Sequence, residues 1–312
     1  MKAPVQLAIR YSKMKVALLG DIHANLPALQ CVLHHAKLCG AEAIYNTGDS
    51  IGYGAFPDEV VTILRRNKVV SILGNYDLKI IRHGAVKGVR RPDGTFNPDS
   101  AMGWSYRALS ENNRSYLKSL PKIIRVSLQG KTILLVHGSP ESNTEHLDPQ
   151  TNQRRLAEIA ESAGADIIIA GHAHWPMAKK CARTWFVNTG SVGRPGDGDP
   201  RACYAMLVLA GSIKVEHYRI QYNVQRAVAA IQANQLPAEF AAMIQTGRSL
   251  EHVMNMNKNE SIPRAQQALS SAAVHRGIFR CLNPNVKSNA AQFWNWPETA
   301  GSPGRISSKP SF

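Results

Sequence analysis

Five short apolar runs, at 15–19, 43–47, 69–73, 132–136 and 167–170, are each followed at once by a small polar cluster next to glycine. Their length and β-branched content predict buried strands. Because α/β sheets bind ligands at the carboxyl ends of their strands, the clusters are predicted to converge on one site. An isolated Asp or His at a strand end is usually structural, but five such clusters in succession indicate a shared function. The clusters are Gly20-Asp21-Ile22-His23, Gly48-Asp49, Gly74-Asn75-Tyr76-Asp77, His137-Gly138 and Gly171-His172-Ala173-His174.

The segments between these runs show helical spacing of apolar residues, and the alternation predicts an α/β fold with mixed sheets. A β-hairpin is predicted at 201–222 because two strand-like runs flank Ala210-Gly211-Ser212. We expect three parts: a leader over 1–14, one folded domain over 15–248, and a weakly ordered basic tail over 249–312 that is rich in Asn, Ser, Pro and Gln. Helices are predicted over 26–38, 57–66, 98–109, 111–117, 152–162, 224–232 and 237–245.

The chain of 312 residues is basic, with 37 Lys and Arg against 22 Asp and Glu and a formal net charge of +15. The basic residues are scattered and no nucleic-acid-binding motif is present, so a solvated surface is favoured over a nucleic-acid face. No apolar run approaches the roughly 18 residues of a membrane span, and the first 14 residues lack the apolar stretch of a secretory signal. Five cysteines without a CxxC pair argue against a disulfide framework. A cytoplasmic protein without membrane attachment is expected, and no feature predicts its oligomeric state.

The polar clusters contain seven oxygen and nitrogen donors and no sulfur, from two Asp, one Asn and four His. Such a set suits Mn²⁺, Fe²⁺, Zn²⁺, Co²⁺ or Ni²⁺. Seven donors exceed one tetrahedral site but fill two sites if one carboxylate bridges. The D-x-H and H-x-H spacings put alternate side chains on the same side of an extended strand end, so each pair can chelate. Two ions roughly 3.5–4 Å apart can clamp the attacking and leaving oxygens of a phosphoryl displacement.

The order D-x-H, G-D, G-N-x-D, H-G and G-H-x-H resembles the calcineurin-like metallophosphoesterase superfamily, above all its small bacterial and archaeal phosphodiesterase-type members. The resemblance covers about 15–247, including Gly52-Tyr53-Gly54 and the loop 188–193. It implies two mixed β-sheets packed as a sandwich flanked by helices, and hydrolysis through a metal-bridging hydroxide, with Mn²⁺ the expected ion. By resemblance, the first metal would bind Asp21, His23 and His174, the second Asn75, His137 and His172, and Asp49 would bridge them.

The chain departs from the family pattern at Tyr76, where many members carry a His that protonates the leaving oxygen. A Tyr with an ordinary pKa near 10 is a poor proton donor at pH 7 compared with a His near 6.5. The departure favours hydrolysis of a small or nucleotide-like phosphodiester and makes Tyr76 a pocket wall. Asp77 is expected to orient its neighbours, and Asn75 to stabilise charge on the phosphoryl oxygens.

Two alternatives stay open at this point. One is a phosphomonoesterase, similar to the protein phosphatases or dinucleoside polyphosphate hydrolases of the superfamily. The other is a non-catalytic scaffold of the same fold, against which the complete donor set argues. Arg194 and Arg201 flank a loop rich in Gly, Asp and Pro and could bind substrate phosphate, although either could equally be a solvated turn residue.

Overall fold

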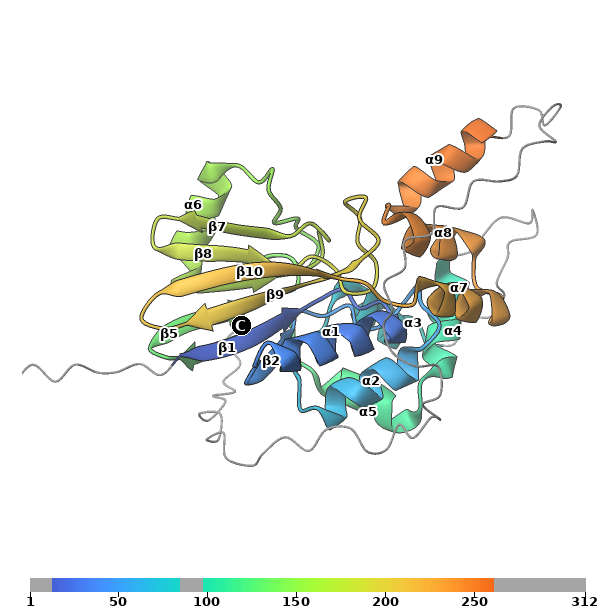
Figure 1. The fold of residues 1–312 in the computed structure, drawn as a ribbon, viewed down its shortest axis with the longest axis horizontal. Helices are drawn as coiled ribbons and strands as arrows, with labels where there is room; N and C mark the ends of the chain where they lie inside the picture. The colour runs from blue at the N-terminus through green and yellow to red at the C-terminus, as the bar shows by residue number, and fades with distance from the viewer. Residues whose placement is uncertain (1–12, 85–97, 261–312) are drawn as a thin grey trace, which may run out of the picture.

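The computed structural model describes residues 13–84 and 98–260, and two five-stranded sheets packed face to face form its centre (Figure 1). The first sheet has the strand order β10-β9-β1-β2-β3. Strands β1, β2 and β3 run parallel, whereas the hairpin β9–β10 pairs antiparallel with β1. These strands are β1 (Met14–Leu19), β2 (Ala43–Asn46), β3 (Val70–Ser71), β9 (Ala202–Leu209) and β10 (Ile213–Ile220).

The second sheet has the order β4-β5-β6-β8-β7 and is also mixed. Its three central strands are parallel, and both edge strands pair antiparallel. The strands are β4 (Ile124–Leu128), β5 (Lys131–Leu135), β6 (Ile167–Ala170), β7 (Met177–Cys181) and β8 (Thr184–Asn188). The predicted sandwich of two mixed sheets is therefore confirmed.

The core is layered because side chains alternate along each buried strand. In β1, Val16 and Leu18 point into the space between the sheets, where they meet Ile133 and Leu135 of β5. Their neighbours Ala17 and Leu19 point the other way, toward helix α1. Residues of β6 divide in the same manner between the inter-sheet core and the outer face. Both faces of each sheet are thus covered, which explains why the central strands read as continuous apolar runs.

Helices cover the two outer faces (Figure 1). α1 and α2 pack on the first sheet and α6 packs on the second, with α3, α4 and α5 beside α2. α1 begins after Asn25, whose side-chain oxygen accepts the Ala28 N–H at 3.2 Å, and has proline in its first turn. These helices are α1 (Leu26–Leu38), α2 (Pro57–Arg66), α3 (Asn75–His83), α4 (Pro98–Ala108), α5 (Glu111–Ser119) and α6 (Gln153–Ala163).

Three C-terminal helices form a group of their own at one end of the sandwich: α7 (Val224–Ala233), α8 (Ala238–Thr246) and α9 (Leu250–Glu260) (Figure 1). Their apolar residues pack with one another, with Ala101 of α4 and with Tyr53. Val253 of α9 is 4% exposed. The predicted boundary at 248 is therefore wrong, because the first eleven residues after Ser249 form a packed helix. Most of the predicted tail, and residues 1–12 of the predicted leader, lie outside the described residues, and Met14 already belongs to β1.

Other elements differ from expectation in detail. β3 has only two residues where five were predicted, and β4, β7, β8 and α3 were not predicted. None of the described helices is long and apolar enough to cross a membrane. The four cysteines within the described ranges are free thiols, and Cys281 lies outside those ranges.

Candidate metal centre

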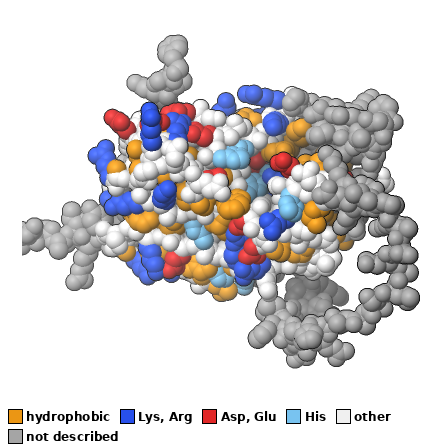
Figure 2. Space-filling model, turned by 90° about the horizontal axis from the view of Figure 1, so that it is seen from above, with side chains coloured by type: hydrophobic (Ala, Val, Ile, Leu, Met, Phe, Trp, Pro, Cys, Tyr) orange, Lys and Arg blue, Asp and Glu red, His pale blue; other side chains and the backbone are white. Residues whose placement is uncertain are grey.

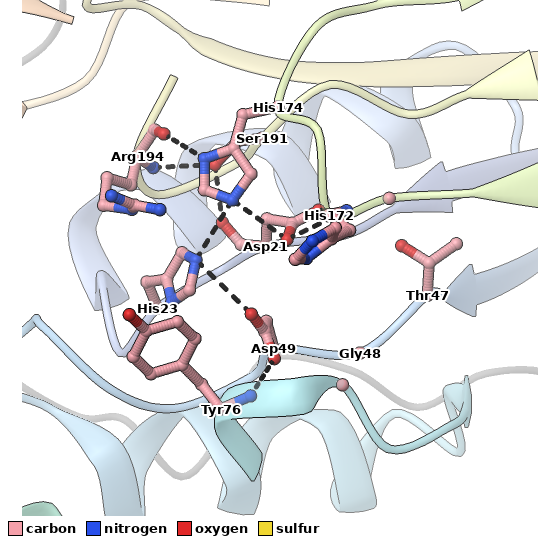
Figure 3. Close-up of polar contacts among 12 residues, drawn as sticks. Asp21, His23, Thr47, Gly48, Asp49, Tyr76, His172, His174, Ser191 and Arg194 are labelled. Carbon is pink, nitrogen blue, oxygen red and sulfur yellow. Dashed lines mark hydrogen bonds and ion pairs between the residues drawn. The ribbon is translucent and has the colours of Figure 1, made fainter. Parts of the chain in front are cut away.

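The seven predicted donors come from the ends of five strands, three in one sheet and two in the other. Asp21 and His23 follow β1, Asp49 follows β2, and Asn75 opens α3 two residues beyond the predicted end of the β3 run. His137 follows β5, and His172 and His174 follow β6. All seven side chains meet at the edge where the two sheets adjoin. Asp21, His23, Asp49, His172 and His174 are labelled in Figure 3.

One group of donors consists of Asp21, His23 and His174. The Nε2 atoms of the two histidines lie 3.2 Å apart, and His174 Nε2 lies 3.0 Å from Asp21 Oδ1. His174 is held in this orientation because its Nδ1 contacts the Arg194 carbonyl oxygen at 2.6 Å. Three ligand atoms from residues that follow strands of both sheets thus lie within 4.8 Å of one another.

The other group surrounds Asp49 and Asn75. His137 Nε2 lies 2.8 Å from Asn75 Oδ1 and 3.5 Å from Asp49 Oδ2, and His172 Nδ1 lies 3.1 Å from the same amide oxygen. His137 is oriented by a contact between its Nδ1 and the Thr47 carbonyl oxygen at 2.9 Å. Asp49 Oδ2 also lies 3.8 Å from His23 Nε2, so one oxygen reaches a histidine of each group. Asp21 also lies within 4.8 Å of the ligand atoms of Asp49 and His137.

Burial and mutual charge set the protonation of these donors. Burial raises the pKa of Asp49, but the His137 ring outweighs it and holds the pKa well below its usual range. In Asp21 the same burial is outweighed by His174, and its pKa is also lowered. Burial lowers the pKa of His172 to about 4 and that of His23 well below its usual value. Both carboxylates are therefore anionic, and both imidazoles neutral, at neutral pH.

This donor set fits divalent metal binding. Two imidazole nitrogens that face each other at 3.2 Å need a proton or a cation between them, and two ionised carboxylates lie beside them. His23 Nδ1 is buried without a hydrogen-bond partner among the described residues. Anionic carboxylates and neutral imidazoles are the forms that bind borderline divalent ions, and the lack of sulfur excludes a soft-metal site.

The backbone that carries the donors is strained. Asp21, His23, Asp49, His172 and His174 all have φ between 48° and 63°. Residues other than glycine rarely adopt these left-handed backbone angles, and each one that does lowers the stability of the folded chain by on the order of 1–3 kcal/mol. The surrounding fold maintains this conformation, partly through backbone hydrogen bonds such as the one from the Asp21 N–H to the Gly48 carbonyl at 3.0 Å. Strain of this kind concentrates where a fold positions functional groups.

Gly74 is required by close approach. A Cβ built on it would lie 2.1 Å from Asp49 Oδ1 and 2.2 Å from the Asp49 backbone nitrogen. Gly74 thus lets the start of α3 press against Asp49, and the Tyr76 N–H then donates to Asp49 Oδ1 at 2.8 Å. The helix start therefore fixes one oxygen of Asp49 and leaves the other facing the histidines (Figure 3).

Asp77 lies behind the donors and is fully buried. Its carboxylate accepts the backbone N–H groups of Gly74 at 3.1 Å, Ser50 at 3.2 Å and Ile51 at 3.1 Å. Burial, and next the nearby Asp49, raise the pKa of Asp77 to about 7. These contacts join the loop after β2 to the start of α3, as expected for a residue that orients the Asp49 segment.

Tyr76 stands at the wall of the cavity. Its hydroxyl is hydrogen-bonded to that of Tyr53, and burial followed by this neighbour raises its pKa above the ordinary value for tyrosine. The Tyr53 ring in turn packs on Phe240 of α8, with ring centroids 4.7 Å apart. Tyr76 therefore holds its proton firmly, and the C-terminal helices support the wall it belongs to.

A cavity of about 410 Å³ opens over the donors. This falls within the roughly 300–1,000 Å³ of small-molecule sites. Figure 2 shows exposed histidine side chains near the middle of the face seen from above, with acidic and basic side chains beside them. The donors that line the cavity are Asp49, Asn75, His172 and His174, and other lining residues are Tyr76, Lys79, His146, Asp148, Ala173, Trp175, Arg194, Gly196, Arg248 and Ser249.

The two arginines predicted to bind phosphate differ. Arg194 lines the cavity, its Cζ lies 4.3 Å from the centroid of the Tyr53 ring, and its Nε is buried without a partner among the described residues. Arg201 does not line the cavity, and its Nη2 is paired with Asp199 Oδ2 at 2.6 Å. The prediction for Arg201 is therefore corrected: the exposed turn supplies its own carboxylate partner.

Several lining residues escaped the sequence reasoning. Lys79 lies in the unpredicted helix α3, and Arg248 follows the glycine that ends α8. His146 is a further lining residue, and its ring centroid lies 4.8 Å from that of His172. The i+4 spacing of Asn75 and Lys79 would have revealed Lys79 once α3 was known, but no local signal marks Arg248 or Trp175.

Comparisons with known proteins support this geometry. The chain is 29% identical over 255 residues to protein MJ0912 of Methanocaldococcus jannaschii, an alignment covering 76% of this chain and 99% of the relative. It is 27% identical over 197 residues to the phosphodiesterase YfcE of Escherichia coli, covering 62% of this chain and 87% of that protein.

Two crystal structures share the fold. A metallophosphoesterase from Sphaerobacter thermophilus has a TM-score of 0.63 and 27% identity, with 75% of this chain and 99% of that chain covered. The protein PH1004 from Pyrococcus horikoshii has a TM-score of 0.66 and 22% identity, with 76% of this chain and 100% of that chain covered. The family model for the calcineurin-like phosphoesterase superfamily domain matches residues 14–212, which carry all seven donors. The chain therefore belongs to the calcineurin-like phosphoesterase superfamily, a family of metal-dependent phosphoester hydrolases that act on small phosphoesters.

Proposed function

We propose that the protein is a phosphodiesterase with a binuclear metal centre that hydrolyses a small or nucleotide-like phosphodiester. The observation that carries the proposal is the convergence of seven oxygen and nitrogen donors beneath one cavity, which four of them line, with Asp49 Oδ2 within 3.8 Å of a histidine from each group. Support also comes from the relative YfcE, which is named a phosphodiesterase.

Two divalent cations, with Mn²⁺ our first choice, would be held by Asp21, His23 and His174 on one side and by Asn75, His137 and His172 on the other. Asp49 would serve both. When bound, such ions supply a nucleophilic water at neutral pH and neutralise phosphoryl charge.

The chain's own residues would bind and orient the ester. Arg194 offers a buried Nε–H without a protein partner, suited to a phosphoryl oxygen. The Asn75 amide lies between His137 and His172, so its side chain is fixed before substrate arrives. The contacts of His137 with the Thr47 carbonyl and of His174 with the Arg194 carbonyl hold both imidazoles in place, which avoids reorganisation during the reaction.

A diester is favoured over a monoester because Tyr76 replaces the usual acid. Its raised pKa and its hydrogen bond to Tyr53 make it a weak proton donor. A leaving group that departs without a proton must be a stable anion, such as an aryloxide or another good leaving group. Monoesters of simple alcohols are therefore expected to be poor substrates.

The test is a panel assay with the purified chain and Mn²⁺, Fe²⁺, Zn²⁺, Co²⁺ or Ni²⁺. Hydrolysis of bis(4-nitrophenyl) phosphate is compared with hydrolysis of 4-nitrophenyl phosphate, which has the same leaving group. We expect a higher kcat/KM for the diester. A higher value for the monoester would establish a phosphomonoesterase, and no turnover with two metals bound would favour a non-catalytic scaffold.

A further inference from the structure

The cavity is lined by several positively charged side chains that are not metal donors. Outside the donor set it is lined by Lys79, Arg194 and Arg248, against one carboxylate, Asp148. Asp148 Oδ1 already accepts the Gln150 N–H at 2.8 Å. Within the described residues, none of the three cations forms an ion pair. Arg194 is the arginine we assign to the reacting phosphoryl group, so Lys79 and Arg248, which are both exposed, are available to a second anionic group.

Lys79 lies on the cavity side of α3. It follows Asn75 by four residues, so the two side chains share one face of the helix. Its Nζ lies 5.2 Å from the centroid of the Tyr76 ring. Lys79 therefore sits one helical turn beyond the donors, over the wall formed by Tyr76.

Arg248 reaches the cavity from the C-terminal helices. α8 ends at Gly247, which has φ +64, and the chain turns there so that Arg248 faces the loop after β8. The Gly198 N–H donates to the Gly247 carbonyl at 2.8 Å, and a Cβ on Gly198 would lie 3.0 Å from Arg248 Cζ.

Acidic groups near Arg248 are already engaged elsewhere. Asp197, which bridges to Arg248 through the backbone, is ion-paired with Arg219, and Asp199 is paired with Arg201. The guanidinium group of Arg248 therefore lies beside the cavity with no ion-pair partner among residues 13–84 and 98–260.

We propose that Lys79 and Arg248 form a second anion subsite, which binds a carboxylate or phosphate group carried by the substrate at a distance from the reacting phosphorus. The inference deepens the proposed phosphodiesterase function and rests on it. It narrows the substrate class to diesters with a second negative charge on one of the two esterified groups.

The test uses two diesters that differ in one charge: 4-carboxyphenyl 4-nitrophenyl phosphate and its neutral analogue with a carbamoyl group. 4-Phosphonophenyl 4-nitrophenyl phosphate distinguishes a phosphate-like anion from a carboxylate. All three release 4-nitrophenolate, so the chemistry is constant. The measured quantity is KM for the neutral ester divided by KM for an anionic ester, both determined on the same protein. A loss of affinity that affects both esters equally cancels in this ratio.

In the Mn²⁺-loaded wild type we expect KM for an anionic ester to be about tenfold lower than for the neutral one, the size of one charge-assisted hydrogen bond. The double variant Lys79→Ala/Arg248→Ala should bring the ratio to about one. Arg154→Ala/Arg201→Ala is the matched control, because it removes the same two positive charges from exposed arginines outside the cavity, and it should keep the wild-type ratio. A wild-type ratio near one, or a ratio retained in the double variant, would overturn the subsite.

Failure of the proposed function gives a different result. If no diester is hydrolysed, the phosphodiesterase proposal falls, and calorimetric binding of 4-carboxyphenyl phosphate against 4-carbamoylphenyl phosphate then tests the subsite alone. Tighter binding of the carboxylate by wild type, lost in the double variant, would support it. Equal affinities would refute it.

Discussion

Asp49 is the residue on which the two halves of the donor set depend. One of its oxygens accepts the Tyr76 N–H, and the other lies within 3.8 Å of His23 and 3.5 Å of His137. An uncharged amide of the same shape would keep the hydrogen-bond geometry but remove the negative charge between two cation sites. Replacing Asp49 by Asn therefore tests the effect of its negative charge separately from the effect of its position.

We predict that Asp49→Asn lowers kcat/KM more than about 100-fold and reduces bound Mn²⁺ below two per chain, since even residues that only orient metal ligands account for 10–100-fold. Metal content and kcat/KM measure the two effects. Asp148→Asn, which alters a cavity carboxylate outside the donor set, should keep two metals. Near wild-type activity with two metals in Asp49→Asn would disprove the binuclear assignment.

Tyr76 permits a test of leaving-group protonation. Tyr76→Phe should change kcat/KM little, since a tyrosine with a raised pKa donates its proton poorly. Tyr76→His places a donor with a pKa near neutrality in the wall, and general acid catalysis typically contributes about 10²–10⁴-fold. The gain should appear on esters with poor leaving groups and not on aryl diesters.

The measurement is kcat/KM for the three proteins on esters of graded leaving-group pKa. A large loss in Tyr76→Phe confined to poor leaving groups would instead identify Tyr76 as the acid.

At the residue scale the sequence indicated which polar side chains would come together, because each belongs to a cluster that follows a recognisable strand and contains a glycine. It did not predict the left-handed backbone of Asp21, His23, Asp49, His172 and His174. Asp and His adopt this conformation more often than most residues other than glycine, but the preference is too weak to predict it, and the surrounding fold imposes it. Arg201 was wrongly assigned because sequence proximity to the loop does not reveal that Asp199 captures it.

Among the elements, the start of α3 has the most direct influence on the metal centre. Gly74→Ala would place a methyl carbon 2.1 Å from Asp49 Oδ1, so either Asp49 or the helix start must move. We predict that metal affinity falls about 10–100-fold while the secondary structure is retained, because a displaced Asp49 binds the metal less well than one in its native position. Titration with Mn²⁺ and circular dichroism provide the two readouts.

Gly211→Ala is the control for that experiment. Gly211 lies in the turn between β9 and β10, has φ +76, and a Cβ there meets nothing within 4 Å. The strain should cost about 1 kcal/mol of stability without affecting metal binding. Equal metal affinity in Gly74→Ala and wild type would show that Asp49 is not positioned by α3.

Several of the elements that were not predicted lack a clear local pattern, for different physical reasons. β4 and β7 are edge strands of the second sheet, with half-exposed residues that include Lys179 and Lys180, so they lack a buried apolar run. α3 has few apolar residues and begins within a donor motif, which hid its helical spacing. α9 depends on tertiary packing of Leu250 and Val253 against α8, which its polar composition did not indicate.

For the whole molecule, the described fold defines where a functional chain can be cut. We propose that residues 13–260 contain the complete catalytic unit, since every donor and every cavity residue lies there. Deleting 261–312 should leave kcat/KM on bis(4-nitrophenyl) phosphate within about twofold. Deleting from 248 onward removes Arg248 and the buried Val253, and burial of one such side chain contributes about 1.5–3 kcal/mol.

The shorter chain is expected to melt several degrees lower than the chain ending at 260, since 1 kcal/mol corresponds to about 2–4 °C at this size. Thermal unfolding of both truncations measures the difference. Identical melting temperatures would mean that α9 adds nothing to the fold.

The division of the donors between the two sheets has a consequence for folding itself. Asp21, His23, Asp49 and Asn75 belong to the first sheet, whereas His137, His172 and His174 belong to the second. A cation that binds both sets is a non-covalent cross-link between halves that unfolding would separate. By mass action, a ligand bound only to the folded chain at 100 times its Kd adds about 2.7 kcal/mol to the free energy of unfolding. The melting temperature should accordingly rise with Mn²⁺ concentration and fall in a chelator, and Asp49→Asn should weaken that dependence. The same ions that carry out the chemistry would then also determine how much of the protein is folded when metal is scarce.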